Sequence, residues 1–215
     1  MDVLGLIPAR GGSKGIPRKN LAIVAGRPLL AWTVDAARAA TELTSVVVST
    51  DDDEIARAAG TEVLRRPAEL AADETPMLKV VRHAVDELEP DVVVLLQPTS
   101  PLRRPEHVDA SVRLLLESGA DAVVSVVEVP HRYRPDALMD VIDGRVVPRG
   151  AVRTRQEKEI VYARNGPAVL AIRSSSLGDD FYGGDCRPYV MNERDSLDVD
   201  TPSDLELAEL ILRAR

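Results

Sequence analysis

Cysteine, aromatic residues and long apolar runs are scarce in this sequence of 215 residues. The single cysteine, Cys186, excludes an intramolecular disulfide and any metal site built from several cysteines. Aromatic residues supply only 3% of the chain, so the core must consist of Ala, Val, Leu and Ile. No run approaches the ~18 apolar residues of a membrane-spanning helix, and the N-terminus lacks a signal-peptide layout. We therefore expect a cytoplasmic protein without a membrane partner.

Acidic residues are missing from one long N-terminal segment, although the formal net charge of the whole chain is −8. The residues from Val3 to Val34 include no Asp or Glu, but they include Arg10, Lys14, Arg18, Lys19 and Arg27. The acidity of the whole chain argues against a nucleic-acid partner, for which a basic surface is expected. The cationic segment therefore indicates a local site for an anion.

The centre of this segment reads IPARGGSKGIPRKN, and we call residues 9–20 the basic loop. Its glycines Gly11, Gly12 and Gly15 allow backbone N–H groups to close around phosphate oxygens, because no Cβ blocks a close approach. The interleaved Arg and Lys side chains can neutralise a polyphosphate. The first hypothesis is therefore a nucleoside triphosphate site.

Other interpretations of the loop stay open at this point. Gly11 to Gly15 fits G-x-S-x-G, with Ser13 as the nucleophile of a serine hydrolase. That arrangement needs an acid and then a histidine downstream of the main sheet, whereas the last histidine here is His131. The loop has neither the Walker A pattern nor the dinucleotide fingerprint G-x-G-x-x-G. A non-catalytic nucleotide-binding module is the other alternative.

Short apolar runs alternate with helical patterns along the chain. Strands are predicted at 3–8, 45–50, 91–97, 122–129 and 168–172, and helices at 28–40, 52–60, 76–88 and 105–119. This alternation predicts an α/β fold with a Rossmann-like, mostly parallel sheet and helices on both faces. Ligands bind at the carboxyl ends of the strands in such folds. The polar segments ARGGSKG, STDDD and QPTSPLR each follow a predicted strand.

The alternation breaks between residues 130 and 165, where seven Arg and one Lys stand against five acidic residues. We interpret the chain as one domain, 1–215, with 130–165 as an excursion. This excursion is an acceptor lid, a dimer arm or both, or else a solvated loop. A turn is expected at Asp143 and Gly144.

A final helix is predicted to begin after Thr201. Thr201 is its N-cap, Pro202 is its first residue and Asp204 completes a capping box.

Two groups of aspartates need different explanations. Asp198 and Asp200 are two positions apart, so on an extended strand their carboxylates project to one side, with Cα atoms roughly 7 Å apart. That arrangement suits Mg²⁺, which takes one or two carboxylates plus substrate phosphates, although both could instead complement the positive end of the next helix. The run from Asp51 to Asp53 lies where a helix N-cap belongs, and capping explains at least two of its members.

The blocks IPARGGSKGIPRKN, STD, RPAELAAD, LLQPTSPLR, RNG and DSLDVDTPSDLELAE occur in this order over nearly the whole chain. Together they resemble the acylneuraminate cytidylyltransferases, or CMP-sialic acid synthetases. The resemblance implies a fold of the nucleotide-diphospho-sugar transferase type with a protruding dimerisation segment, and a homodimer. It also implies Mg²⁺-dependent transfer of CMP from CTP to an acidic acceptor with release of pyrophosphate. The default acceptor is a 2-keto sugar acid of the sialic, KDN or legionaminic type.

The resemblance also assigns roles to individual residues. It implies that the triphosphate is held for catalysis by Arg10, Lys14 and Lys19, and that the nucleotide contacts Ala9, Gly11, Gly12, Ser13, Asn20 and, at the base, Arg66. The acceptor is expected at Gln97, Arg155, Tyr162 and Asn165, and Mg²⁺ at Asp198 and Asp200. From the residues alone, Gln97 and its neighbours Thr99 and Ser100 could bind sugar hydroxyls or a base, or serve only as turn residues.

Two departures from the family pattern concern specificity. Met77 stands where the family places a small hydroxyl residue beside the base, which leaves the strictness of cytosine selection open. Four arginines crowd the region near the Asn-Gly block: Arg132, Arg134, Arg153 and Arg164. Guanidinium groups in place of aromatic surface would favour a smaller, more anionic acceptor. The alternative acceptor is therefore a small phosphonate or phosphonocarboxylate.

Overall fold

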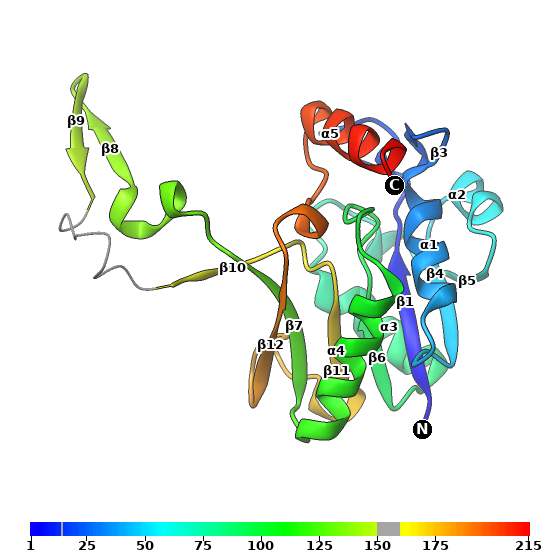
Figure 1. Ribbon diagram of the computed structural model, residues 1–215. Helices are drawn as coiled ribbons and strands as arrows, with labels where there is room; N and C mark the ends of the chain where they lie inside the picture. The colour runs from blue at the N-terminus through cyan, green and yellow to red at the C-terminus, as the bar shows by residue number, and fades with distance from the viewer. Residues whose placement is uncertain (14, 150–159) are drawn as a thin grey trace.

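A sheet of eight strands forms the centre of the computed structural model, which describes residues 1–13, 15–149 and 160–215 (Figure 1). The strand order is β10-β7-β11-β6-β1-β4-β5, and β12 lies beside β7. The strands are β1 (Val3–Pro8), β4 (Ser45–Thr50), β5 (Glu62–Arg65), β6 (Val92–Leu95), β7 (Ala122–Glu128), β10 (Tyr162–Arg164), β11 (Leu170–Arg173) and β12 (Cys186–Met191).

Most neighbouring strands run in the same direction. β1 pairs in parallel with β4 and β6, β4 with β5, and β7 with β12. Among the described strands of this sheet, β10 and β11 are antiparallel to their neighbours. The mostly parallel α/β sheet is therefore confirmed, and the short edge strand β5 is an element that the sequence pattern does not predict.

Helices cover both faces of the sheet, as expected. α1 (Leu29–Ala39), α2 (Asp53–Ala58) and α4 (Pro105–Ser118) pack on one face, and α3 (Met77–Leu88) packs on the other. In β1 the alternation of side chains sends Val3 and Ile7 to the first face and Leu4 and Leu6 to the second. A strand buried on both faces has an unbroken apolar sequence, which is the physical reason for the run VLGLIP.

Helix α5 (Pro202–Arg213) lies at the end of the sheet where β1 ends (Figure 1). Its start matches the prediction: the Thr201 side chain accepts a hydrogen bond from the Asp204 N–H, and Asp204 completes the capping box. A small apolar cluster holds α5 against the short hairpin of β2 (Ile23–Val24) and β3 (Arg27–Pro28). Buried Val199 belongs to this cluster, so α5 supports the segment just before it.

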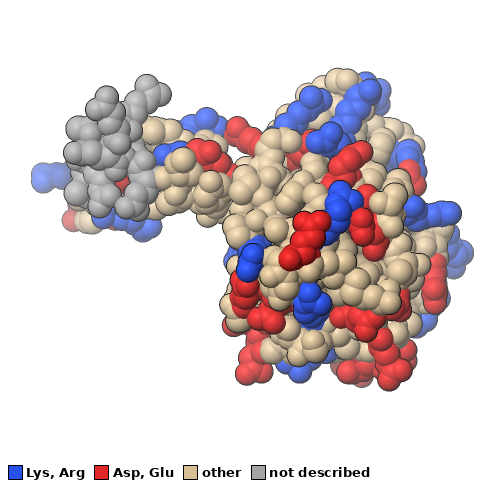
Figure 2. Space-filling view, turned by 60° about the horizontal axis from the view of Figure 1, so that its bottom comes forward, with Lys and Arg blue, Asp and Glu red and all other residues tan. Residues whose placement is uncertain are grey.

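The excursion leaves the body after β7 and returns through β10 (Figure 1). It carries a two-stranded hairpin of β8 (Met139–Ile142) and β9 (Arg145–Pro148), which is a sheet of its own. The predicted turn is confirmed, because Asp143 and Gly144 join these strands with φ values of 50° and 74°. Figure 2 shows this arm standing away from a body on which positive and negative side chains are interspersed.

None of the helices within the described ranges has the length and apolar character to cross a bilayer.

Candidate active site

The basic loop leaves β1 and lies across the carboxyl end of β4. The Ala9 N–H donates to the carbonyl oxygen of Ser49 (2.9 Å), and the Gly11 N–H donates to Asp51 Oδ1 (3.0 Å). A Cβ on Gly11 would lie 2.7 Å from a carboxylate oxygen of Asp52. Only glycine allows this approach, so the start of the loop is held closely against the end of β4.

The described cations of the basic loop all contact carboxylates from elsewhere in the chain. The pairs are Arg10 with Asp73 (2.6 Å), Arg18 with Asp52 (2.8 Å) and Glu54 (2.5 Å), and Lys19 with Asp200 (3.1 Å). Lys14 lies outside the described residues. The basic loop lacks acidic residues of its own, and the fold brings carboxylates from distant parts of the chain into contact with its cations. Any anion that takes these cations must displace or share their carboxylates.

The predicted acidic pair brackets a firmly anchored residue, Val199. The Val199 side chain is buried, its N–H donates to the Thr99 carbonyl oxygen (2.7 Å), and its own carbonyl oxygen accepts from Lys19 Nζ (2.8 Å). The carboxylates on either side, Asp198 and Asp200, both face one pocket. A Cβ on Gly15 would lie 2.8 Å from the Asp200 carbonyl oxygen, so the basic loop and this segment are in close contact.

The electrostatics of Asp198 are those of a partly buried carboxylate. Burial raises its pKa above the ordinary value, a hydrogen bond with the Thr99 side chain lowers it, Asp200 raises it and Lys19 lowers it. Its Oδ1 atom is buried and has no hydrogen-bond partner among the described residues. A bound cation would satisfy this oxygen and neutralise its charge.

The donor set fits Mg²⁺. This ion is usually held by one or two carboxylates, with water and substrate phosphates completing the octahedron. Asp198 and Asp200 supply two carboxylates, one of them with an unpartnered oxygen. Within the described ranges no group of three or more His, Cys, Asp or Glu residues is arranged for a metal ion. The protein would therefore supply part of the coordination shell and leave the rest to substrate and water.

A pocket of about 250 Å³ lies between the basic loop, the QPTSPLR turn and the acidic pair. Its described lining residues are Pro8, Arg10, Gly12, Ser13, Lys19, Asn20, Arg66, Met77, Gln97, Pro98, Thr99, Asp198 and Asp200. A second pocket of about 230 Å³ adjoins it, because the two share Arg10, Arg66 and Met77. Of the predicted triphosphate, base and metal residues, Arg10, Lys19, Arg66, Asp198 and Asp200 are thus brought together around these adjoining pockets.

Arg66 lines both pockets. Its guanidinium donates to the side chain (3.2 Å) and carbonyl oxygen (2.8 Å) of Ser49, which fixes its orientation. Burial lowers its pKa to about 10, Asp51 opposes this effect and Arg10 adds to it. Arg66 therefore remains a cation at neutral pH and presents a fixed donor group to both pockets.

The expected acceptor residues are not all at the pocket. Gln97 lines it, and Arg155 lies outside the described residues. Tyr162 is 51% exposed on β10 at the base of the arm. Asn165 is buried, and both ends of its amide are occupied by protein partners. Neither Tyr162 nor Asn165 is among the described residues that line the pocket.

The aspartates after β4 differ from the prediction. Only Asp52 caps α2, accepting from the N–H groups of Glu54 and Ile55 (both 2.9 Å). The Asp51 carboxylate is directed to the basic loop, and Asp53 pairs with Arg65 (2.6 Å). The expectation that capping explains at least two of the three is therefore wrong.

Asp73 is a further site residue, because it contacts Arg10. It ends the RPAELAAD block, but the sequence alone gives no role for it.

The chain is similar in sequence to several known proteins. The chain is 31% identical over 215 residues to an N-acylneuraminate cytidylyltransferase of Escherichia coli O18:K1:H7, and 35% identical over 215 residues to N-acylneuraminate cytidylyltransferase A of Danio rerio. Each match covers 96% of this chain, which spans about half the length of these two relatives. A CMP-N,N'-diacetyllegionaminic acid synthase of Legionella pneumophila is 33% identical over 229 residues, covering 99% of this chain and 97% of that protein.

Solved structures show the same fold class. A CMP:2-keto-3-deoxy-manno-octonic acid synthetase complexed with CTP superposes with a TM-score of 0.78 at 18% identity, covering 100% of this chain and 99% of that one. A cytidylyltransferase from Leptospira borgpetersenii gives 0.64 at 20% identity, covering 100% and 88%. The chain therefore shares the α/β fold of these two structures. The family model described as Cytidylyltransferase matches residues 4–214, and the chain belongs to this family.

Proposed function

We propose that this protein is a Mg²⁺-dependent cytidylyltransferase that transfers CMP from CTP to a 2-keto sugar acid and releases pyrophosphate. The observation that carries the proposal is the meeting of the basic loop and the acidic pair around one pocket, where Lys19 contacts Asp200. A triphosphate and its counter-cation need such a juxtaposition of fixed positive groups and carboxylates.

Each group at the pocket has a task in this reaction. A hydroxyl oxygen of the acceptor attacks the α-phosphorus and gives its proton to solvent, while the bond between the α-phosphorus and the α,β-bridging oxygen breaks and pyrophosphate leaves. Arg10 and Lys19 neutralise the charge that gathers on the departing pyrophosphate. Asp198 and Asp200 would hold Mg²⁺, which supplies further neutralisation of the triphosphate. Gln97 and Thr99 are neutral groups on the turn after β6 that line the pocket, and in this proposal they would orient sugar hydroxyls.

The sugar-acid class of acceptor is supported by the relatives, whose names refer to N-acylneuraminate and legionaminic acid. The phosphonate alternative relied on four arginines near the Asn-Gly block. Arg132 and Arg164 stack over the rings of Tyr133 and Tyr182, and Arg134 pairs with Glu128. None of these three lines the pocket among the described residues, and Arg153 lies outside them. We therefore retain the sugar acid as the proposed acceptor.

The experiment is a pyrophosphate-release assay with CTP and Mg²⁺. Each acceptor is supplied separately: N-acetylneuraminic acid, KDN, a legionaminic acid and a small phosphonate. Release with a sugar acid is expected. Release with the phosphonate alone would overturn the proposed acceptor but not the transferase activity.

The hydrolase alternative is tested by Ser13→Ala. A transferase should keep its activity in this variant, whereas a serine hydrolase would lose it. Tight CTP binding without release from any acceptor would favour a binding module instead.

We also propose that the arm makes the protein a homodimer. Val141, Ile142 and Val146 on its hairpin are 74%, 55% and 65% exposed, and the hairpin pairs with no other described strand. An isolated two-stranded hairpin is at best marginally stable in water. A second copy that covers these side chains would stabilise it.

A further inference from the structure

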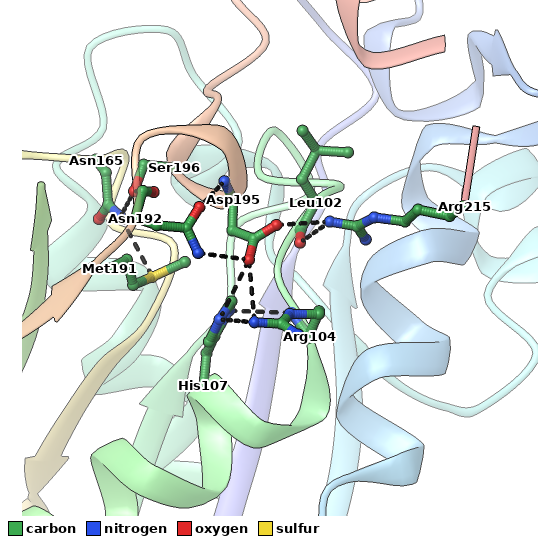
Figure 3. Close-up of polar contacts among 9 residues, drawn as sticks. All are labelled: Leu102, Arg104, His107, Asn165, Met191, Asn192, Asp195, Ser196 and Arg215. Atoms are coloured by element: carbon green, nitrogen blue, oxygen red, sulfur yellow. Dashed lines mark hydrogen bonds and ion pairs between the residues drawn. The ribbon is translucent and has the colours of Figure 1, made fainter. Parts of the chain in front are cut away.

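Asp195 is a buried carboxylate close in sequence to the acidic pair but outside the pocket (Figure 3). Its side chain is only 8% exposed and lies among cationic and amide groups from three parts of the chain. The contacts are to Arg215 Nη2 (2.7 Å), Asn192 Nδ2 (2.8 Å), Arg104 Nη2 (3.2 Å) and His107 Nε2 (3.6 Å). A buried charge requires such partners.

These partners tie the segment before the acidic pair to the QPTSPLR turn. Arg215 donates both to Asp195 and to the carbonyl oxygen of Leu102 in that turn (2.9 Å). Arg104 is the N-cap residue of α4, directly after the turn. Further along the segment, the Val199 N–H reaches Thr99 in the same turn. The segment 195–199 is therefore attached to the turn at both of its ends.

A second branch of hydrogen bonds joins the segment 192–196 to Asn165 and β7. The Ser196 hydroxyl donates to the carbonyl oxygen of Asn192 (2.7 Å) and accepts from Asn165 Nδ2 (3.0 Å), as Figure 3 shows. Asn165 Oδ1 in turn accepts from Ser125 on β7 (2.6 Å). With Met191 and the Ala168 N–H also in contact, both lone pairs and both N–H groups of the Asn165 amide are used.

The two branches bear directly on the position of Asp198. Gly166, next to Asn165, is so close that a Cβ there would lie 3.6 Å from the Asp198 carboxyl carbon and 3.1 Å from Ser100 Oγ. The Asp198 carboxylate thus has Gly166 near it on one side and a hydrogen bond with the Thr99 side chain of the turn on the other. The network reaches both neighbours, because Asn165 directly precedes Gly166 and Arg215 donates to Leu102 in the turn.

We propose that Asp195 is a positioning residue: its ion pairs with Arg104 and Arg215 set the segment that presents Asp198 and Asp200 to the nucleotide's metal ion. This inference rests on the proposed function. Asn165 belongs to the same network and acts through it, as a support for Asp198 and not as a contact to the acceptor.

The test compares the binding of preformed Mn²⁺·CTP with that of CTP in EDTA, by calorimetry and without acceptor. The ratio of the two affinities isolates the metal contribution from nucleotide binding. In Asp195→Asn we expect this ratio to fall about 10-fold, the lower end of the effect of groups that orient metal ligands, while metal-free CTP binds within about twofold of wild type. The matched control is Asp179→Asn, because Asp179 is fully exposed and does not line the pocket.

Asp198→Asn serves as the reference that should lose the metal contribution. A wild-type protein without any preference for Mn²⁺·CTP would overturn the proposed function itself. A wild-type ratio in Asp195→Asn, or an equal loss for both ligand forms, would overturn the positioning role alone. Should Asp195→Asn fail to fold, Arg215→Gln removes the same ion pair from its more exposed side and must show the same selective loss.

Discussion

Lys19 Nζ lies 3.1 Å from Asp200 Oδ1, although the two residues are 181 positions apart in the sequence. The same ammonium donates to the Val199 carbonyl oxygen (2.8 Å), so it joins the basic loop to the acidic pair. Lys19 is thus the point where the two halves of the candidate site meet, and its contacts hold both in place before any nucleotide binds.

Replacing this ammonium should reduce the chemical step strongly. In Lys19→Met we expect kcat/KM for CTP to fall on the order of 10²-fold, as for the loss of other preorganised electrostatic groups. Steady-state kinetics at saturating acceptor measure the effect. The control is Lys79→Met, a lysine on α3 that does not line the pocket. Equal kinetics in the two variants would contradict the role given to Lys19.

The close packing of Gly15 against Asp200 predicts a loss of stability without nucleotide. A methyl group in Gly15→Ala would meet the Asp200 carbonyl oxygen at 2.8 Å, so we expect the free energy of unfolding to fall by about 1–3 kcal/mol, as in other overpacked sites. Gly12→Ala is the control, because a Cβ at Gly12 would meet no described atom within 4 Å. Urea denaturation of both variants decides the point, and similar midpoints would count against the contact.

His107 should make stability depend on pH. Burial lowers its pKa below the ordinary value and Arg104 lowers it further, while Asp195 raises it. Below about pH 6.5 the unfolded chain gains a proton that the folded protein takes up only at lower pH, so stability falls as the pH falls. His107→Gln removes this titration but keeps an acceptor for the capping box with Arg104. The free energy of unfolding should fall less between about pH 7.5 and 5.5 in this variant. Parallel pH profiles would refute the explanation.

The arm should control the oligomeric state. In Val141→Glu a charge is placed on an apolar side chain of the hairpin that is 74% exposed in the single chain. We expect the protein to sediment as a monomer, because burying that charge between two copies is unfavourable. Leu210→Glu is the matched control, since Leu210 is 67% exposed on α5 of the body. A Val141→Glu protein that remains dimeric would place the interface elsewhere.

Most helices and strands of the body can be predicted from the sequence. Their local signals, such as helix caps, occur there together with the apolar runs of buried strands. The strand VVVL of β6 is buried on both faces, and Thr201 with Asp204 caps α5 as the capping-box pattern requires. The hairpin of the arm is not predicted as strands, although its turn is. Its exposed residues have no core face in the single chain, so they lack the alternation that a half-buried strand shows.

The candidate site is predictable in its chemistry but not in its pairings. Arg10 and Lys19 stand out because the surrounding segment lacks acids. Their partners Asp73 and Asp200 lie far along the chain, and only the fold brings them close. Asn165 illustrates the same limit, because its polar partners Ser125 and Ser196 are 40 and 31 positions away. A resemblance can mark such a residue as important without revealing what it touches.

The prior pairing of the loop cations has a consequence for turnover. Because Arg10 and Lys19 already hold carboxylates, an incoming ligand gains only the difference between its own attraction and that of Asp73 and Asp200. Under the proposed function, the triphosphate of CTP carries more negative charge than the phosphate diester of the conjugate, so it would compete better for these cations. The resident aspartates would thus reclaim the cations after each cycle and hasten departure of the finished conjugate.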